Sequence, residues 1–175
     1  MKINRRRFSI TIVLGAIGAF LFDAFWLETY MINWTSFDIS EKSDDEKIKV
    51  VQLTDMHMTK LQPYHRTLIK RTNQENPDII FITGDAINEN KNLPELDEFL
   101  SLLNPEIQKI FILGNKEYWG NVNIPEFKLL CEKYNGTLLV NENTTVTIKN
   151  RTLTVIGVDD FVGGNADFGK AAEKV

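Results

Sequence analysis

The stretch "IIFITGD", residues 79–85, sets how the rest of the chain is interpreted. Its first five residues form an unbroken apolar and β-branched run, which predicts a strand that is covered on both faces. Gly84 and Asp85 follow at the carboxyl end, where a glycine lets the backbone turn sharply and approach its neighbours closely. We therefore expect a fully buried strand of a parallel sheet, with a carboxylate just after its carboxyl end.

Strands and helices alternate on both sides of this stretch. The patterns predict further strands at 48–54, 110–113 and 137–140, and helices at 64–76, 94–103 and 123–134. They also predict a hairpin of 146–148 and 153–158 around Asn150 and Arg151, and a last helix that begins near Asn165. This alternation predicts an α/β fold with a parallel sheet covered on both faces. In such sheets ligands bind beyond the carboxyl ends of the strands.

Polar residues stand at those carboxyl ends. Asp55, Asp85 and Asn115 each follow a predicted strand and are spaced 30 residues apart, and a glycine precedes the last two. His57 comes two residues after Asp55, a spacing that places both side chains on one side of an extended chain. Carboxylate, imidazole and amide oxygen ligands suit Mn, Fe, Zn or Mg. The sequence therefore predicts a site for divalent metal ions at this edge.

The same residues resemble the signature of a known family, the calcineurin-like metallophosphoesterases. The resemblance covers residues 48 to about 164 and rests on Asp55-x-His57, Gly84-Asp85 and Gly114-Asn115-x-Glu117. It implies a sandwich of two sheets flanked by helices and a site that holds two divalent metal ions. By resemblance, Asp55 and His57 bind the first ion, Asp85 bridges the two, and Asn115 binds the second. Two such ions clamp the reacting oxygens of a phosphate ester.

The chain departs from the family pattern in two places. Lys116 stands where the family has a histidine that assists the reacting phosphate, so we assign Lys116 and the following Glu117 to the catalytic positions. Glu117 is expected to hold the Lys116 ammonium. The family pattern continues with further histidines, whereas His57 and His65 are the only histidines here. We therefore expect 48–175 to be the N-terminal part of the domain, incomplete at the C-terminus, with little or no hydrolysis by this chain alone.

The first 34 residues are typical of a targeting segment. The cluster Arg5-Arg6-Arg7-Phe8 resembles a twin-arginine signal, and the run from Ile10 to Phe22 is almost wholly apolar. We interpret 1–34 as a twin-arginine-like signal or membrane anchor and 35–47 as a polar linker. The expected location is the cell membrane, with the rest of the chain after residue 34, which we call the body, on the extracytoplasmic side.

The net charge of the body makes some binding partners less favourable than others. Residues 1–34 contain four of the 20 basic and two of the 24 acidic residues, which leaves 16 basic and 22 acidic residues for the rest. A body with a net charge of −6 is a poor partner for nucleic acid. The leading hypothesis is a membrane-associated, metal-dependent phosphoester hydrolase, with lipid-linked phosphates among the substrates considered. The alternatives are a catalytically dead, membrane-tethered binding remnant of the family and a nucleotide-binding α/β domain, which lacks its Gly-x-Gly-x-x-Gly fingerprint here.

Other notable side chains are interpreted as structural. We expect Cys131 in the core, His65 at the surface, Tyr118 and Trp119 packed under the site, and Asp159 and Asp160 in a turn.

Overall fold

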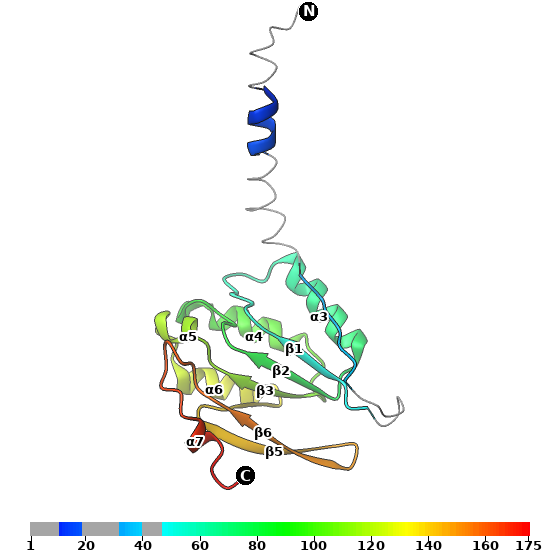
Figure 1. Ribbon diagram of the computed structural model, residues 1–175, viewed down its shortest axis with the longest axis vertical. Helices are drawn as coiled ribbons and strands as arrows, with labels where there is room; N and C mark the ends of the chain where they lie inside the picture. The colour runs from blue at the N-terminus through cyan, green and yellow to red at the C-terminus, as the bar shows by residue number, and fades with distance from the viewer. Residues whose placement is uncertain (1–10, 19–31, 40–46) are drawn as a thin grey trace, which may run out of the picture. The chain divides into compact units, whose positions relative to one another are not determined.

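The computed structural model describes residues 11–18, 32–39 and 47–175 (Figure 1). The chain divides into two compact units, Met1–Asp38 and Ile39–Val175. In the first unit, residues 11–18 are helical. Most of the predicted targeting segment and of the polar linker lies outside the described residues. Within the described part of the chain, the structure contains no helix that is both long and apolar enough for a membrane span.

The second unit is built on a parallel sheet of four strands in the order β1-β2-β3-β4. The strands are β1 (Val50–Leu53), β2 (Ile79–Thr83), β3 (Gln108–Ile112) and β4 (Gly136–Leu138). Val50 pairs with Ile79, and Ile79 with Gln108, so the carboxyl ends of the first three strands lie at one edge. The predicted α/β fold with a parallel sheet is confirmed, and β2 lies between β1 and β3.

Helices connect the strands and cover one face of the sheet (Figure 1). They are α3 (Pro63–Glu75), the 3-10 helix η3 (Asn90–Asn92), α4 (Leu93–Ser101), α5 (Asn115–Trp119) and α6 (Ile124–Lys133). The last short helix, α7 (Phe168–Ala171), lies against strand β5 (Glu142–Ile148) instead. Phe111 of β3 packs edge-on against Phe127 of α6, with ring centroids 6.2 Å apart. Asn123 caps α6 as predicted, because its side chain accepts a hydrogen bond from the Glu126 N–H.

A hairpin covers part of the other face of the sheet. Its strands, β5 (Glu142–Ile148) and β6 (Arg151–Gly157), are antiparallel and form a separate two-stranded sheet. Val146 and Ile148 of the hairpin pack with Ile79 and Ile110 of the parallel sheet in one buried cluster. β5 begins four residues before the predicted strand, because its first residues, "ENTT", lack the apolar alternation that marks a strand.

β3 begins at Gln108, two residues before its apolar run, and includes a buried lysine. Lys109 is fully buried, and its ammonium donates hydrogen bonds to the carbonyl oxygens of Asn104 and Ile107 at 3.0 and 2.7 Å. Burial lowers the pKa of Lys109 to about 8. The carbonyl oxygens of the preceding loop satisfy a charge that would otherwise be costly inside the fold.

Several structural predictions need correction, and one is confirmed. His65 is not at the surface: it is 1% exposed, because its Nδ1 accepts the Gln62 N–H at the start of α3 and its ring packs on Phe99. Trp119 is 59% exposed and does not pack under the site. The last helix is capped by Asp167, whose side chain accepts the Lys170 N–H, and not by Asn165. Cys131 is buried in the core as predicted.

Candidate metal site

The site begins where the backbone leaves β1 and β2. Hydrogen bonds continue past both strands, from the His57 N–H to the Asp85 carbonyl (2.8 Å) and from the Met58 N–H to the Ala86 carbonyl (3.0 Å). Asp55, His57 and Asp85 all have positive φ angles, 53°, 45° and 51°. Residues other than glycine in this region carry backbone strain of order 1–3 kcal/mol, and such strain clusters at functional sites. Asp55 and His57 therefore converge through a strained loop and not through strand alternation.

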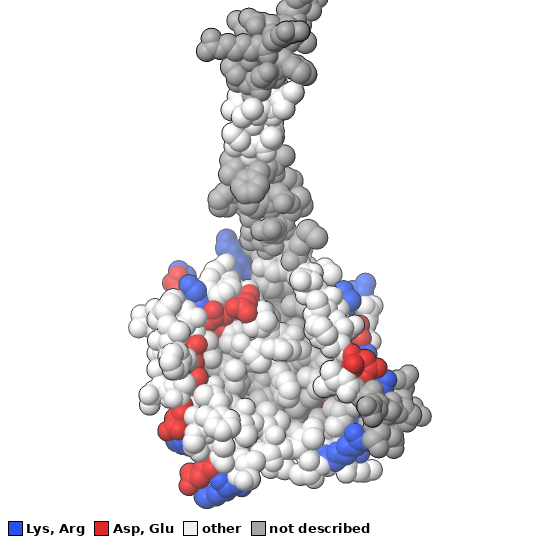
Figure 2. Space-filling view, viewed as in Figure 1, with Lys and Arg blue, Asp and Glu red and all other residues white. Residues whose placement is uncertain are grey.

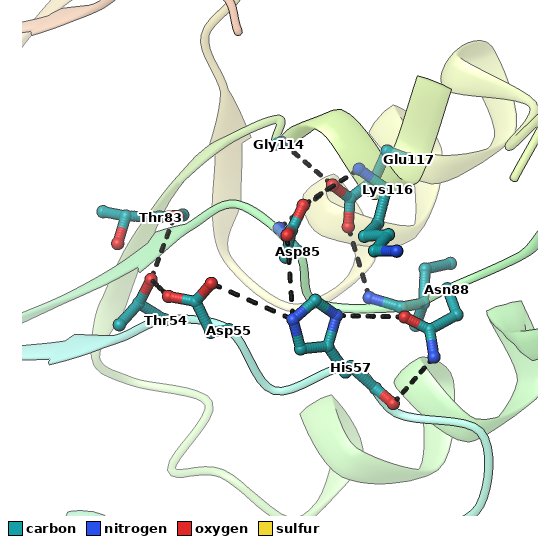
Figure 3. A network of polar contacts seen from close by, with 10 residues as sticks. Thr54, Asp55, His57, Thr83, Asp85, Asn88, Gly114, Lys116 and Glu117 are labelled. Atoms are coloured by element: carbon teal, nitrogen blue, oxygen red, sulfur yellow. Dashed lines mark hydrogen bonds and ion pairs between the residues drawn. The ribbon is translucent and has the colours of Figure 1, made fainter. Parts of the chain in front are cut away.

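Three potential ligand side chains meet at this point (Figure 3). One ligand atom from each of Asp55, His57 and Asp85 lies within 4.8 Å of the other two. Nε2 of His57 lies 3.9 Å from Oδ1 of Asp55 and 3.7 Å from Oδ2 of Asp85. The Asp85 side chain is 13% exposed and that of Asp55 65% exposed, so the group opens to solvent on the Asp55 side. This geometry brings together three of the four predicted metal ligands.

Each of the three side chains is held by its other polar atom. Oδ2 of Asp55 accepts from the Thr54 hydroxyl (2.6 Å), Oδ1 of Asp85 accepts from the Lys116 N–H (2.9 Å), and Nδ1 of His57 lies 3.0 Å from Oδ1 of Asn88. The remaining atoms, Oδ1 of Asp55, Nε2 of His57 and Oδ2 of Asp85, are the ones that face each other. The site is thus organised to present one free donor atom per side chain.

Two glycines allow the loops after β2 and β3 to touch. Gly84 has a φ of 83°, and a Cβ there would approach the Gly114 Cα to 2.9 Å. A Cβ on Gly114 would overlap the side chain and the backbone nitrogen of Asp85. The predicted need for glycine at both strand ends is therefore confirmed, because any side chain would push Asp85 out of place.

Glu117 forms hydrogen bonds with both of these loops. It is 1% exposed, and its carboxylate accepts hydrogen bonds from the backbone N–H groups of Gly114 (2.9 Å), Asp85 (3.0 Å) and Ile87 (3.2 Å). Burial raises the pKa of Glu117, while these N–H donors act in the opposite direction. The Glu117 carboxylate therefore stabilises the loop that carries Asp85. Its oxygens bind these backbone N–H groups and not, as predicted from the sequence, the Lys116 ammonium.

Lys116 and Asn115 lie at the start of α5, beside Asp85. Lys116 contributes its backbone N–H to Asp85, and its ammonium lies 5.4 Å from the centre of the Trp119 ring. Asn115 begins the helix, and the loop around Gly163 packs on it: a Cβ on Gly163 would meet the Asn115 Cα at 3.1 Å. The structure thus places the backbone of Lys116 against Asp85, and Asn115 is the residue directly before it.

The segment after β6 packs against α5. The Tyr118 hydroxyl donates to Oδ1 of Asp159 at 2.5 Å, and burial together with this bond raises the pKa of Tyr118. Asp159 also accepts the N–H groups of Asp160 and Asn165. Asp159 is therefore a turn carboxylate, as predicted. Sequence reasoning missed Tyr118 as its partner, and also Thr54 and Asn88, which contact the ligands.

Charged side chains are unevenly spread over the face of the molecule that Figure 2 shows. On the face that Figure 2 shows, acidic and basic side chains of the described residues lie mainly around the margin, and few lie in the middle.

The fold and the site together define an α/β protein with a metal-binding group at the carboxyl edge of its sheet. A family model described as calcineurin-like phosphoesterase matches residues 48–169. The chain belongs to this family. It is 31% identical over 159 residues to an uncharacterized metallophosphoesterase of Aquifex aeolicus, an alignment that covers 88% of this chain and 56% of that protein.

Other relatives agree with this assignment. The chain is 30% identical over 131 residues to the metallophosphoesterase Cj0846 of Campylobacter jejuni, which covers 73% of this chain and 34% of that protein. It is 26% identical over 183 residues to the metallophosphoesterase YkuE of Bacillus subtilis, which covers 95% and 63%. This chain thus spans about a third to two thirds of the length of these relatives.

The donor set fits the divalent metals that this family uses. Two carboxylate oxygens and one imidazole nitrogen are ligands for Mn, Fe, Zn or Mg, and the group contains no thiolate, which would select softer ions. Asp55, His57 and Asp85 are therefore the candidate ligands, in agreement with the predicted cofactor.

Proposed function

We propose that this chain serves metal-dependent hydrolysis of a phosphate ester. The observation that carries the proposal is the convergence of three free donor atoms, from Asp55, His57 and Asp85, at the carboxyl edge of a parallel sheet. Family membership supports the same reaction class. We also propose that the β5–β6 hairpin belongs to the second sheet of the family's sandwich, since its apolar side packs on β2 and β3.

The residues have separate roles in this proposal. A divalent ion bound to the three donors would supply Lewis-acid chemistry, which polarises a phosphoryl oxygen and lowers the pKa of a water molecule. Asn115, next to Asp85, is the proposed ligand for a second ion. Lys116 supplies a positive charge for the phosphate where the family has a histidine, although as a flexible point charge. Glu117 keeps the loop of Asp85 in place through the backbone.

Hydrolysis of bis-p-nitrophenyl phosphate with excess Mn2+ tests the proposal. We expect little or no turnover by the full chain, and any turnover should depend on Mn2+ and be lost in Asp85→Ala, because Asp85 offers its free oxygen to the ion. Lys116→His should not produce a fast enzyme. Acid assistance is worth about 10²–10⁴-fold, and a more complete metal shell would be needed for it to have that effect, since the converging group of carboxylate and imidazole side chains in the described residues has three members.

Phosphate binding without turnover is the second candidate function. Lys116 at the family's histidine position favours it, because a lysine ammonium can attract a phosphate as a point charge, whereas the imidazole that the family places there to assist the reaction is missing. Calorimetry with inorganic phosphate separates the two. Mn2+-dependent phosphate binding with no hydrolysis would support the binding module, and neither binding nor hydrolysis would contradict both.

A membrane-tethered location is a separate proposal, supported by the sequence pattern of residues 1–34. We expect protease added to intact spheroplasts to digest the body from Ser36 onward. Replacing Arg5, Arg6 and Arg7 with lysines should retain the body inside if the twin-arginine route is used. A body that resists protease until the cells are lysed would show that the proposed export is wrong.

A further inference from the structure

The contacts of His57 assign a role to Asn88, which was not among the site residues predicted from the sequence. We propose that Asn88 is a positioning residue that keeps the proton of His57 on Nδ1 and leaves Nε2 free as a metal ligand. This inference rests on the proposed metal site, since a free Nε2 has a function only if an ion binds there.

The two hydrogen bonds of Asn88 determine its orientation. One end of its amide lies 3.4 Å from the His57 carbonyl oxygen, and the other lies 3.0 Å from Nδ1 of the same residue. The carbonyl oxygen can only accept, so the NH2 group of Asn88 must face it. The amide oxygen then faces Nδ1, and because that oxygen also only accepts, Nδ1 must carry the proton. In the neutral ring, Nε2 is left with its lone pair.

The lone pair points toward the other two ligands. Nε2 is the atom that lies 3.9 Å from Oδ1 of Asp55 and 3.7 Å from Oδ2 of Asp85 (Figure 3). A metal-binding histidine needs its second nitrogen hydrogen-bonded to a fixed acceptor, which sets both tautomer and ring orientation. Without Asn88, the His57 ring, whose side chain is 37% exposed, could rotate or take up a proton on Nε2.

The backbone segment that carries Asn88 is fixed by its neighbours. Its neighbour Ile87 donates its N–H to buried Glu117 and forms a parallel bridge with Met58. A Cβ on Gly120, at the end of α5, would overlap the Asn88 carbonyl, so α5 packs directly on this segment. Asn88 is therefore fixed by the same elements that position Asp85, as a positioning residue must be.

The tautomer of His57 can be measured without metal or substrate. The chain has two histidines, so nitrogen-15 NMR of the metal-free full chain, at a pH well above the ordinary imidazole pKa of about 6.5, should resolve both rings. We expect His57 to carry its proton on Nδ1. His65 is an internal control with the opposite result, because its Nδ1 accepts the Gln62 N–H and its proton must lie on Nε2.

Variants test the role of Asn88 directly. Asn88→Leu removes the acceptor at similar size, and we expect His57 to shift toward the Nε2–H form and the Mn2+ affinity to fall about 10- to 100-fold. Asn88→Asp keeps an acceptor for Nδ1–H and should restore both. Asn92→Leu is the matched control, because Asn92 is a buried asparagine that contacts the same loop through the Thr59 carbonyl and not His57.

The outcomes distinguish this inference from the proposed function. If no form of the chain binds Mn2+ but the tautomer depends on Asn88, the metal function fails and the positioning of His57 stands. If wild-type His57 carries its proton on Nε2, or if Asn88→Leu changes neither the tautomer nor the affinity, the role of Asn88 is wrong. If Asn88→Leu does not fold, the nitrogen-15 spectrum of the wild type and the Asn88→Asp variant still test whether Asn88 sets the tautomer of His57.

Discussion

Asp85→Ala is expected to reduce the affinity of the chain for Mn2+ by at least about 100-fold, since even residues behind a ligand cost 10- to 100-fold. The substitution removes the least exposed of the three converging donors, Oδ2, which lies 3.7 Å from Nε2 of His57. It also removes the acceptor for the Lys116 N–H, so the start of α5 loses one of its links to the site, while the bond from the Asp85 N–H to Glu117 remains. Isothermal titration calorimetry of the full chain measures the change.

Two further variants make the Asp85 result specific. Asp97→Ala is a control, because Asp97 pairs with Lys133 and Tyr134 and is outside the converging group. The Asp97→Ala variant should therefore bind Mn2+ as tightly as the wild type. Asp85→Asn keeps the acceptor for Lys116 but loses the charge, and should bind Mn2+ weakly. Equal affinity of wild type and Asp85→Ala would contradict the whole ligand assignment.

Glu117→Ala is expected to lower the free energy of unfolding by about 3–5 kcal/mol, the largest stability effect that we predict. Three backbone N–H groups, of Gly114, Asp85 and Ile87, would lose their acceptor inside the protein. A buried unsatisfied donor costs about 1–3 kcal/mol, and the three losses overlap because they share one side chain. Urea unfolding followed by circular dichroism measures the difference.

Glu117→Gln separates hydrogen bonding from packing. Its one amide oxygen can still accept from Gly114 and Asp85, which share Oε2 in the wild type, so about half of the loss should be recovered. Glu126→Ala, on the outer part of α6, should change stability by less than about 0.5 kcal/mol. A loss below about 1 kcal/mol in Glu117→Ala would mean that water replaces the carboxylate and that the brace is not needed.

The parallel sheet and the ligand group were predictable because both depend on local signals. The apolar runs at 79–83 and 110–113 indicate strands in any context, and equal spacing of Asp55 and Asp85 follows from one strand–helix unit between them. Parallel pairing then brings the two carboxylates to one edge, as the pairing of Leu53 with Ile82 confirms. Family membership followed from the same few residues.

The partners of these ligands were not predictable, because they depend on how loops distant in sequence pack together. His57 and Asn88 are 31 residues apart, and nothing periodic marks a loop asparagine as the partner of a ring nitrogen. His65 carries a polar ring, yet the packing of α3 buries it on Phe99.

Glu117 shows the same limit most clearly. Its position in the signature indicated a role at the site but not which atoms its carboxylate would meet. The first turn of α5 directs it inward, where three backbone N–H groups from two loops need an acceptor. The local sequence therefore determines which ligand atoms the site contains. The tertiary structure determines how those atoms are oriented, because buried polar groups must find hydrogen-bond partners once water is excluded.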